Sequence, residues 1–74
     1  MNKQRRKQLQ EIVDKISELK EHLDFLIEEE QEAFENLPGG IQSSDRGTKM
    51  ENKISEMEYI SSDLEDLSMR LVEL

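Results

Sequence analysis

The side chains that most often carry catalysis or bind metals are scarce in this chain of 74 residues. It has no cysteine and a single histidine, His22, whereas zinc and iron–sulfur sites need several Cys or His ligands. A di-metal helical bundle needs Glu-x-x-His pairs, but Leu19 stands three residues before His22. The sequence also lacks a Ser/His/Asp order, and we interpret Gly39-Gly40 as a helix terminator rather than a phosphate-binding loop. We therefore expect a protein that is not an enzyme and that binds no metal or cofactor.

Charge is the strongest chemical feature, with 18 acidic and 10 basic side chains and a net charge of -8. Five carboxylates fall within residues 28–35. They could mimic the phosphates of DNA, dock on a basic partner protein, or form a solvated face, and their density repels nucleic acid. Residues 3–7 carry four basic side chains, which can contact nucleic acid or an acidic protein, meet an acidic surface of a second copy, or be solvated. For the chain as a whole we do not expect direct nucleic-acid binding.

Two long helices must position these side chains, because apolar residues recur at steps of three and four along most of the chain. We predict a first helix over about residues 3–36, a loop over about 37–45 and a second helix over about 46–74. Pro38 disfavours helical geometry at the residue before it, and the glycine pair that follows is free to adopt positive φ.

The predicted seam of the first helix is interrupted by Glu30. A buried carboxylate is costly unless it is paired, so we expect the helices to splay or admit solvent there, with a basic group from a partner or a functional role as alternatives. In the second helix Ser61 and Ser68 occupy alternative seam positions, where we expect exposed serines rather than a close approach of two backbones. The predicted seam comprises Leu9, Ile12, Ile16, Leu19, Leu23, Leu26, Ala33 and Leu37, flanked by Val13, Ile27 and Phe34, and then Met50, Ile54, Met57, Ile60, Leu64, Leu67, Leu71 and Leu74.

The predicted fold class is all-α, a long antiparallel helical hairpin that dimerises into a four-helix bundle or coiled coil. Hydrophobic residues make up 34% of the chain, too few for a compact monomeric core, and small domains without disulfides or metals commonly rely on self-association. A lone hairpin would leave the flanking apolar stripe exposed, which favours a homodimer. The predicted oligomer interface comprises Leu9, Ile12, Ile16, Leu19, Leu23, Leu26, Ile27, Phe34, Ile54, Met57, Ile60, Leu64, Leu67 and Leu71.

Nothing in the sequence predicts a membrane segment. The longest apolar run is Phe25-Leu26-Ile27, far short of the roughly 20 residues that a spanning helix needs. The basic N-terminal stretch lacks the apolar segment of a secretory signal. We therefore expect a cytoplasmic protein that does not associate with membranes.

The turn between the helices carries a motif. It reads Ala33-Phe34-x-Asn36-Leu37-Pro38-x-Gly40-Ile41-Gln42 and is followed by Arg46-Gly47 and Met50-Glu51. Over roughly residues 28–67 the chain resembles a family of small acidic helical proteins encoded by bacteriophages and prophages. The resemblance implies a phage accessory protein acting in the host cytoplasm, a class that includes inhibitors of host immunity.

From the charge density and the turn together, we predict a non-enzymatic phage-type accessory protein that binds and inhibits a host protein, such as an antiviral defence factor. Two alternatives are an oligomeric sponge for a nucleotide signal, with Arg46 and the basic N-terminus as anion contacts, and a purely structural coiled-coil module. The turn also has a structural interpretation. In it, Leu37 and Ile41 cover the end of the bundle, and the amides of Asn36 and Gln42 form hydrogen bonds with backbone groups of the loop. The predicted partner-binding residues are Glu28, Glu29, Glu32, Glu35, Asn36, Leu37, Pro38, Ile41, Gln42 and Arg46.

Overall fold

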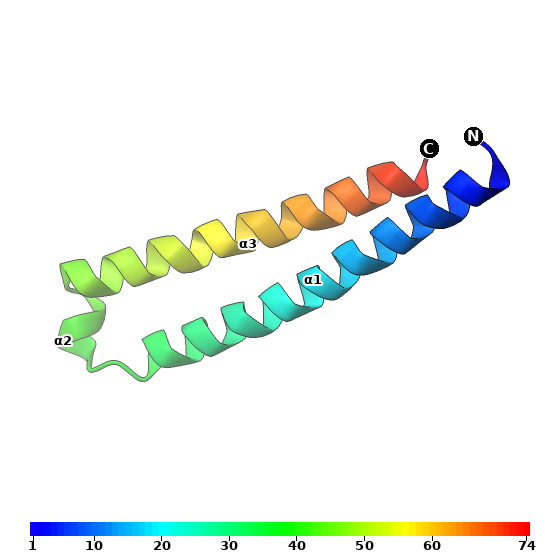
Figure 1. Cartoon of the computed structure of the whole chain (residues 1–74). Coiled ribbons are helices and arrows are strands. Elements are labelled where there is room, and N and C mark those ends of the chain that lie inside the picture. The colour runs from blue at the N-terminus through cyan, green and yellow to red at the C-terminus, as the bar shows by residue number, and fades with distance from the viewer.

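The chain folds into a long helical hairpin, which confirms the predicted all-α architecture. The computed structural model describes residues 1–74, with α1 over Lys3–Glu35, α2 over Gly39–Gln42 and α3 over Asp45–Val72. Figure 1 shows α1 and α3 lying antiparallel, with both chain ends at one end of the hairpin and α2 at the other. The Cα atoms extend over 58 × 15 × 11 Å. None of the three helices combines the length and the apolar character that a membrane span requires.

Side-chain caps mark where the two long helices begin. The Asn2 Oδ1 atom accepts a hydrogen bond from the Arg5 amide at 2.8 Å, and Ser44 does the same for the amide of Gly47 at 3.5 Å. These caps satisfy amides that have no partner within the first turn of a helix. The helix bounds lie within two residues of those predicted from apolar periodicity and Pro38.

The predicted loop over residues 37–45 contains a helical turn, α2, and its glycines behave differently from the expectation. No glycine of the chain has positive φ, so the prediction that the pair ends α1 by adopting that conformation is wrong. Pro38 instead starts α2, because its carbonyl oxygen accepts hydrogen bonds from the amides of Ile41 at 2.8 Å and Gln42 at 3.0 Å. The two long helices are therefore joined by an ordered turn.

The buried seam of α1 keeps Leu9, Ile16 and Leu23 of the predicted one but lies one residue later at the positions between them. Val13 and Ile27, predicted as flanks, are only 7% and 6% exposed, whereas Ile12, Leu19 and Leu26, predicted in the seam, are exposed. The observed seam keeps a heptad rhythm of alternating steps of four and three. Its buried and half-buried members on α1 are Leu9, Val13, Ile16, Lys20, Leu23, Ile27 and Phe34.

Lys20 accounts for the difference between the predicted and the observed seam of α1. It occupies a seam position but is not apolar, so apolar periodicity does not include it, yet its side chain is only 26% exposed. The aliphatic stem of a lysine can cover apolar surface while the ammonium group reaches polar partners. The seam therefore continues through a charged residue, and the apolar residues one position earlier are left outside.

On α3, small residues lie where the two helices meet. Ser61 is 5% exposed and Ser68 is half-buried, so the prediction of exposed serines is wrong for Ser61. Small side chains allow the facing helix to approach, and the Ser61 hydroxyl donates a hydrogen bond to Asp24 of α1. The seam residues of α3 are Gly47, Met50, Ile54, Met57, Ser61, Leu64, Ser68 and Leu71.

Candidate interaction surfaces

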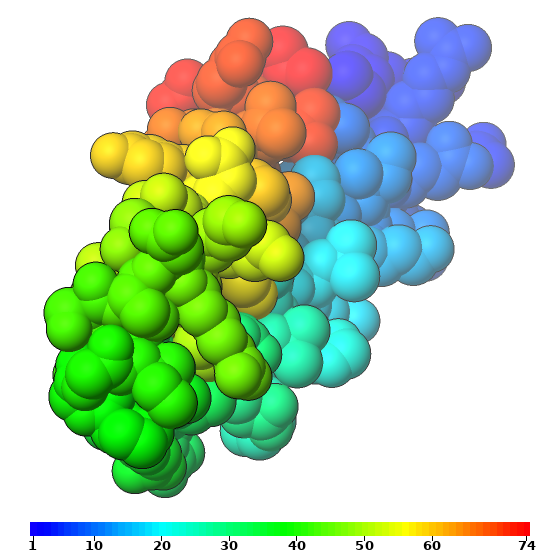
Figure 2. All heavy atoms as spheres, turned by 90° about the vertical axis from the view of Figure 1, so that its left-hand side faces the viewer, coloured from blue at the N-terminus to red at the C-terminus, as the bar shows by residue number.

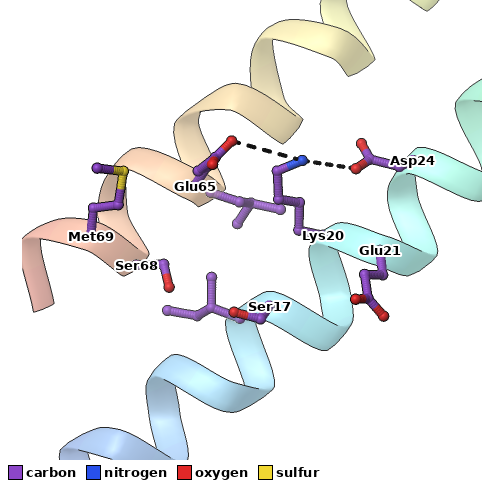
Figure 3. Close-up of a pocket in the computed structure, with 9 residues that line it drawn as sticks. Ser17, Lys20, Glu21, Asp24, Glu65, Ser68 and Met69 are labelled. Atoms are coloured by element: carbon purple, nitrogen blue, oxygen red, sulfur yellow. Dashed lines mark hydrogen bonds and ion pairs between the residues drawn. The ribbon is translucent and has the colours of Figure 1, made fainter. Parts of the chain in front are cut away.

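A polar junction crosses the hairpin on one side of the seam. Figure 3 shows the Lys20 ammonium group between Asp24 of its own helix and Glu65 of α3, at 2.8 and 4.0 Å. Asp24 also accepts the hydrogen bond from Ser61. Further along the same side, the Gln31 amide donates to Glu58 at 2.7 Å. These contacts between the helices fix the register of α1 against α3.

The charges of the junction stabilise one another. The hydrogen bond from Lys20, with that from Ser61, holds the pKa of the Asp24 carboxyl below its ordinary value. The hydrogen bond to Asp24 raises the pKa of the Lys20 amino group. Two donors thus favour the ionised form of the Asp24 carboxylate, and the Ser61 donor ties it to α3.

The turn is held by one amide side chain. The Gln42 Nε2 group donates to the carbonyl oxygens of Phe34, Glu35 and Leu37, each at 3.1 Å. Those carbonyls lie at or just beyond the end of α1, where helical partners run out. Ile41 is half-buried beside them. Gln42 therefore closes the end of α1, and its amide is occupied within the chain.

Gly47 is the position where the turn meets α3. A Cβ atom there would lie 2.5 Å from the carbonyl oxygen of Ile41 and closer still to that of Gln42, both of which are backbone atoms. The close approach of α2 to α3 therefore requires glycine. Gly39 and Gly40 have no atom within 4 Å of such a position. The sequence motif contained Gly47, but nothing in its spacing distinguished it from the other two glycines.

Three further residues of the turn that were predicted to bind a partner are exposed. Asn36, Pro38 and Arg46 all face solvent. Arg46 borders a shallow depression together with Lys49, Met50, Lys53 and Glu30. Glu30 is exposed, in agreement with the prediction that solvent reaches it. Three basic groups thus gather beside the one carboxylate that interrupts the seam.

The outer side of α1 is lined by carboxylates that recur at steps of three and four. We call this surface the acidic ridge; Phe25 takes one place in it, and every member is exposed. Residues spaced this way share one face of a helix. Predicted partner-binding residues Glu28, Glu32 and Glu35 belong to the ridge, and Glu29 lies outside its repeat. The ridge comprises Glu11, Asp14, Glu18, Glu21, Phe25, Glu28, Glu32 and Glu35.

An apolar face lies on the side of the seam opposite the polar junction. On each helix its members are seven residues apart, and each stands at the position just before a seam position. In a pair of antiparallel helices, these positions of both helices lie on the same side of the pair. The register set by the Asp24–Ser61 contact puts Leu19 level with Leu67. The exposed fractions run from 42% to 70%. The apolar face comprises Ile12, Leu19 and Leu26 of α1 and Ile60, Leu67 and Leu74 of α3.

The predicted oligomer-interface residues divide between two surfaces. Five lie on the apolar face, where a second molecule can reach them, and the other nine lie in the seam within one hairpin. Sequence periodicity had merged two adjacent stripes into one interface, because both repeat every seven residues. The seam members are Leu9, Ile16, Leu23, Ile27, Phe34, Ile54, Met57, Leu64 and Leu71, and the face members are Ile12, Leu19, Leu26, Ile60 and Leu67.

The chain contains no group of three or more His, Asp or Glu side chains placed to hold a metal ion. Its depressions are open to solvent and lie along the two grooves between the helices. Figure 2, which views the hairpin from the turn, shows α3 and α1 side by side behind it. No protein-family model, curated protein or solved structure matches this chain.

Proposed function

We propose that this protein is a non-enzymatic binding protein whose acidic ridge covers a basic surface of another protein. The observation that carries the proposal is the ridge itself. Its carboxylates are exposed along one straight helix and lie on a different side from both the seam and the apolar face. No cation of the chain forms an ion pair with any of them, since the ion pairs involve only Lys20, Asp24 and Glu65.

The charge density of the ridge favours a protein surface as the target. Residues 11–35 span about 36 Å of helix, so the ridge carries one charge per about 5 Å. Duplex DNA carries one charge per about 1.7 Å of its axis. The ridge therefore reproduces a duplex only sparsely, but it can pair with lysine and arginine side chains spread over a basic patch or groove.

Phe25 gives the ridge an anchor for such a partner. It is 58% exposed and lies in the row of carboxylates on the outer side of α1. Aromatic residues are enriched among the few interface residues that dominate binding energy, while surrounding charges mainly set encounter rate and specificity. A ridge with one aromatic among seven carboxylates fits that division of roles.

Because the turn resembles that of phage and prophage accessory proteins, we propose that the partner is a protein of a host cell. A small protein that covers a basic surface prevents that surface from binding its own ligand, and a host defence factor is a suitable target. In this proposal the turn maintains the shape of the hairpin through Gln42 and Gly47, while Asn36 and Arg46 remain available at its exposed edge.

We also propose that the hairpin works as a homodimer. The chain exposes 6057 Å² and buries only five residues, whereas a compact monomer of 8.7 kDa exposes about 4,700 Å². The excess of about 1,300 Å² is surface that a typical monomer of this mass keeps from water. The acidic ridge and the apolar face lie on different sides, so a dimer through the face leaves two ridges free.

The ridge is tested by affinity capture with matched variants. Immobilised wild type is expected to retain a host protein that salt releases, and the ridge variant is expected to lose it. The control removes the same number of charges from exposed positions of α3, and it is expected to retain the protein. Equal retention by the ridge variant would contradict the proposal. The ridge variant is Glu18→Gln, Glu21→Gln, Glu28→Gln and Glu32→Gln, and the control is Glu51→Gln, Glu56→Gln, Asp63→Asn and Asp66→Asn.

A second candidate function, sequestration of an anionic nucleotide, is favoured by the basic depression beside the turn. Arg46, Lys49 and Lys53 border it, and none of them forms an ion pair. Such groups can hold phosphate oxygens. A thermal shift with nucleotides at millimolar concentration, abolished by Arg46→Ala with Lys53→Ala, would support this candidate. No shift across a nucleotide panel would eliminate it and leave the ridge proposal intact.

A further inference from the structure

We propose that a second copy of this chain covers the apolar face in one specific orientation. The two-fold axis passes level with Leu19 and Leu67, the two α1 helices stack antiparallel, and the turns lie at opposite ends of the dimer. This inference rests on the proposed self-association and specifies the geometry of the dimer. In this orientation each apolar face contacts the same face of the second copy, as an isologous contact requires.

The apolar residues are symmetric about the proposed axis. On α1, Ile12 and Leu26 lie seven residues to either side of Leu19; on α3, Ile60 and Leu74 lie seven to either side of Leu67. The axis therefore stacks leucine on leucine at its centre and pairs the outer members of each row. Residue 19 is also the midpoint of α1, which spans Lys3–Glu35, so the whole of α1 lies along its counterpart.

Charge at the ends of the face fits the same arrangement. Continuing the heptad row of α1 by one step in each direction reaches Arg5 at one end of the helix and Ala33 near the other. The axis brings Arg5 of one copy over Ala33 of the second copy, within about one turn of that copy's Glu29 and Glu30. The small Ala33 leaves room for the guanidinium group. Glu30, the exposed carboxylate at a seam position, then gains a basic partner.

The overall charge distribution disfavours the other two-fold arrangement, with both turns at one end. The axis divides the chain at Leu19 and Leu67. Residues 20–66, on the turn side, hold four basic and fourteen acidic side chains, a net charge of -10, whereas the remaining residues hold six basic and four acidic side chains. Turns at the same end would stack two of these acidic halves against each other. Turns at opposite ends set the acidic end of α1 against the basic N-terminal end of the second copy.

The area of the contact suits a stable dimer. The two α1 helices overlap over about 50 Å, and the two copies of residues 60–74 overlap over about 22 Å. At a helix width of about 10 Å, the footprint of the contact is about 700 Å². A standard stable interface buries about 800 Å² on each partner. This footprint also lies within the excess surface of about 1,300 Å² that the lone hairpin exposes.

Single-cysteine cross-linking tests the orientation, and the chain has no cysteine of its own. A disulfide demands specific Cα and Cβ geometry, whereas a short bis-maleimide tolerates a wider range of separations between two stacked helices, so the bis-maleimide is the suitable probe. Leu19→Cys is expected to cross-link to a dimer, because the axis places two copies of residue 19 together. Ile12→Cys alone is expected not to, but a mixture of Ile12→Cys and Leu26→Cys chains is expected to cross-link.

Light scattering of the uncross-linked protein separates failure of the orientation from failure of self-association. A monomeric mass at the cross-linking concentration would overturn both. A dimeric mass in which Leu19→Cys cross-links only to Leu67→Cys would overturn the orientation alone, because that pair stacks when the turns lie at the same end.

Charged substitutions supply a second test in the full chain. Leu19→Glu is expected to raise the dimer dissociation constant at least about 100-fold, since both copies lose a buried leucine. Met69→Glu is the matched control. The exposed fraction of Met69 is 57%, close to the 60% of Leu19, but Met69 lies outside the apolar face. Arg5→Glu is expected to weaken the dimer, and Glu29→Arg with Glu30→Arg in the same chain is expected to restore it. Equal masses for the Leu19 and Met69 variants, or no rescue, would overturn the proposal.

Discussion

Gly47→Ala isolates the contact that joins the turn to α3. An alanine there helps the helix itself, because replacing a helical glycine gains up to about 1 kcal/mol of helix propensity, and Gly47 lies in the first turn of α3. The added Cβ atom, however, would lie within 2.5 Å of two backbone carbonyl oxygens, whereas ordinary contact begins at 3.4 Å. Neither oxygen belongs to a flexible side chain, so α2 must move away from α3 by about 1 Å or more.

The net effect follows from comparing these two terms. Overpacking costs about 1–3 kcal/mol, and displacing Gln42 strains the contacts of its amide, whose two N–H groups are shared among three carbonyl oxygens and are worth about 0.5–1.5 kcal/mol each. We expect Gly47→Ala to lower the free energy of unfolding by about 2 kcal/mol in spite of the propensity gain. Gly40→Ala meets no atom within 4 Å, so it is expected to be neutral or to stabilise the chain by about 0.4–1 kcal/mol.

Urea denaturation followed by circular dichroism measures both variants. All samples must share one protein concentration, because self-association contributes to apparent stability. The expected order of midpoints is Gly40→Ala at or above wild type, and Gly47→Ala clearly below it. If Gly47→Ala unfolds at or above the wild-type midpoint, the close approach of α2 to α3 does not exist in solution and the reasoning fails.

Three further predictions concern the turn, the polar junction and the seam. Gln42→Ala is expected to lower the free energy of unfolding by about 1–2 kcal/mol in urea denaturation, because the carbonyl groups of Glu35 and Leu37 lose the Gln42 donor and that of Phe34 keeps only the Leu37 amide; an unchanged midpoint would show that water replaces the amide without cost. The depressed pKa of Asp24 makes its contribution to stability fully present above the ordinary carboxyl pKa, and the contribution is lost as pH falls through the folded-state pKa. The midpoint of Asp24→Asn is therefore expected below that of wild type at neutral pH and to converge with it in acid, and a gap that persists below the folded-state pKa would contradict the assignment. Ser61→Leu is expected to destabilise the hairpin by about 1–3 kcal/mol through overpacking, whereas Ser62→Leu, at an exposed position, is expected to change it by no more than about 0.5 kcal/mol; similar thermal midpoints for the two variants would place residue 61 outside the seam.

The candidate surfaces were only partly predictable. The carboxylates near the turn stand out in the sequence, but the ridge extends back to Glu11, and its membership depends on which side of α1 faces α3. The apolar face was visible as apolar periodicity, yet it could not be told apart from the seam. Its heptad row on α1 is apolar at residues 12, 19 and 26, whereas the neighbouring buried row is interrupted by Lys20. The roles of Gln42 and Gly47 depend on the path of α2, which no local pattern described.

Local chemistry explains what the sequence by itself determined: two long helices, their bounds, the break at Pro38 and the concentration of negative charge near the turn. Helix periodicity, capping and proline geometry act over a few residues, and such signals can be read one segment at a time. The tertiary structure alone decided which apolar stripe is buried. That choice depends on what the opposite helix offers at each level, and Ser61 with Asp24 admits Lys20 to the seam. A partner 37 residues away along the chain leaves no trace in local periodicity, because packing couples residues through space.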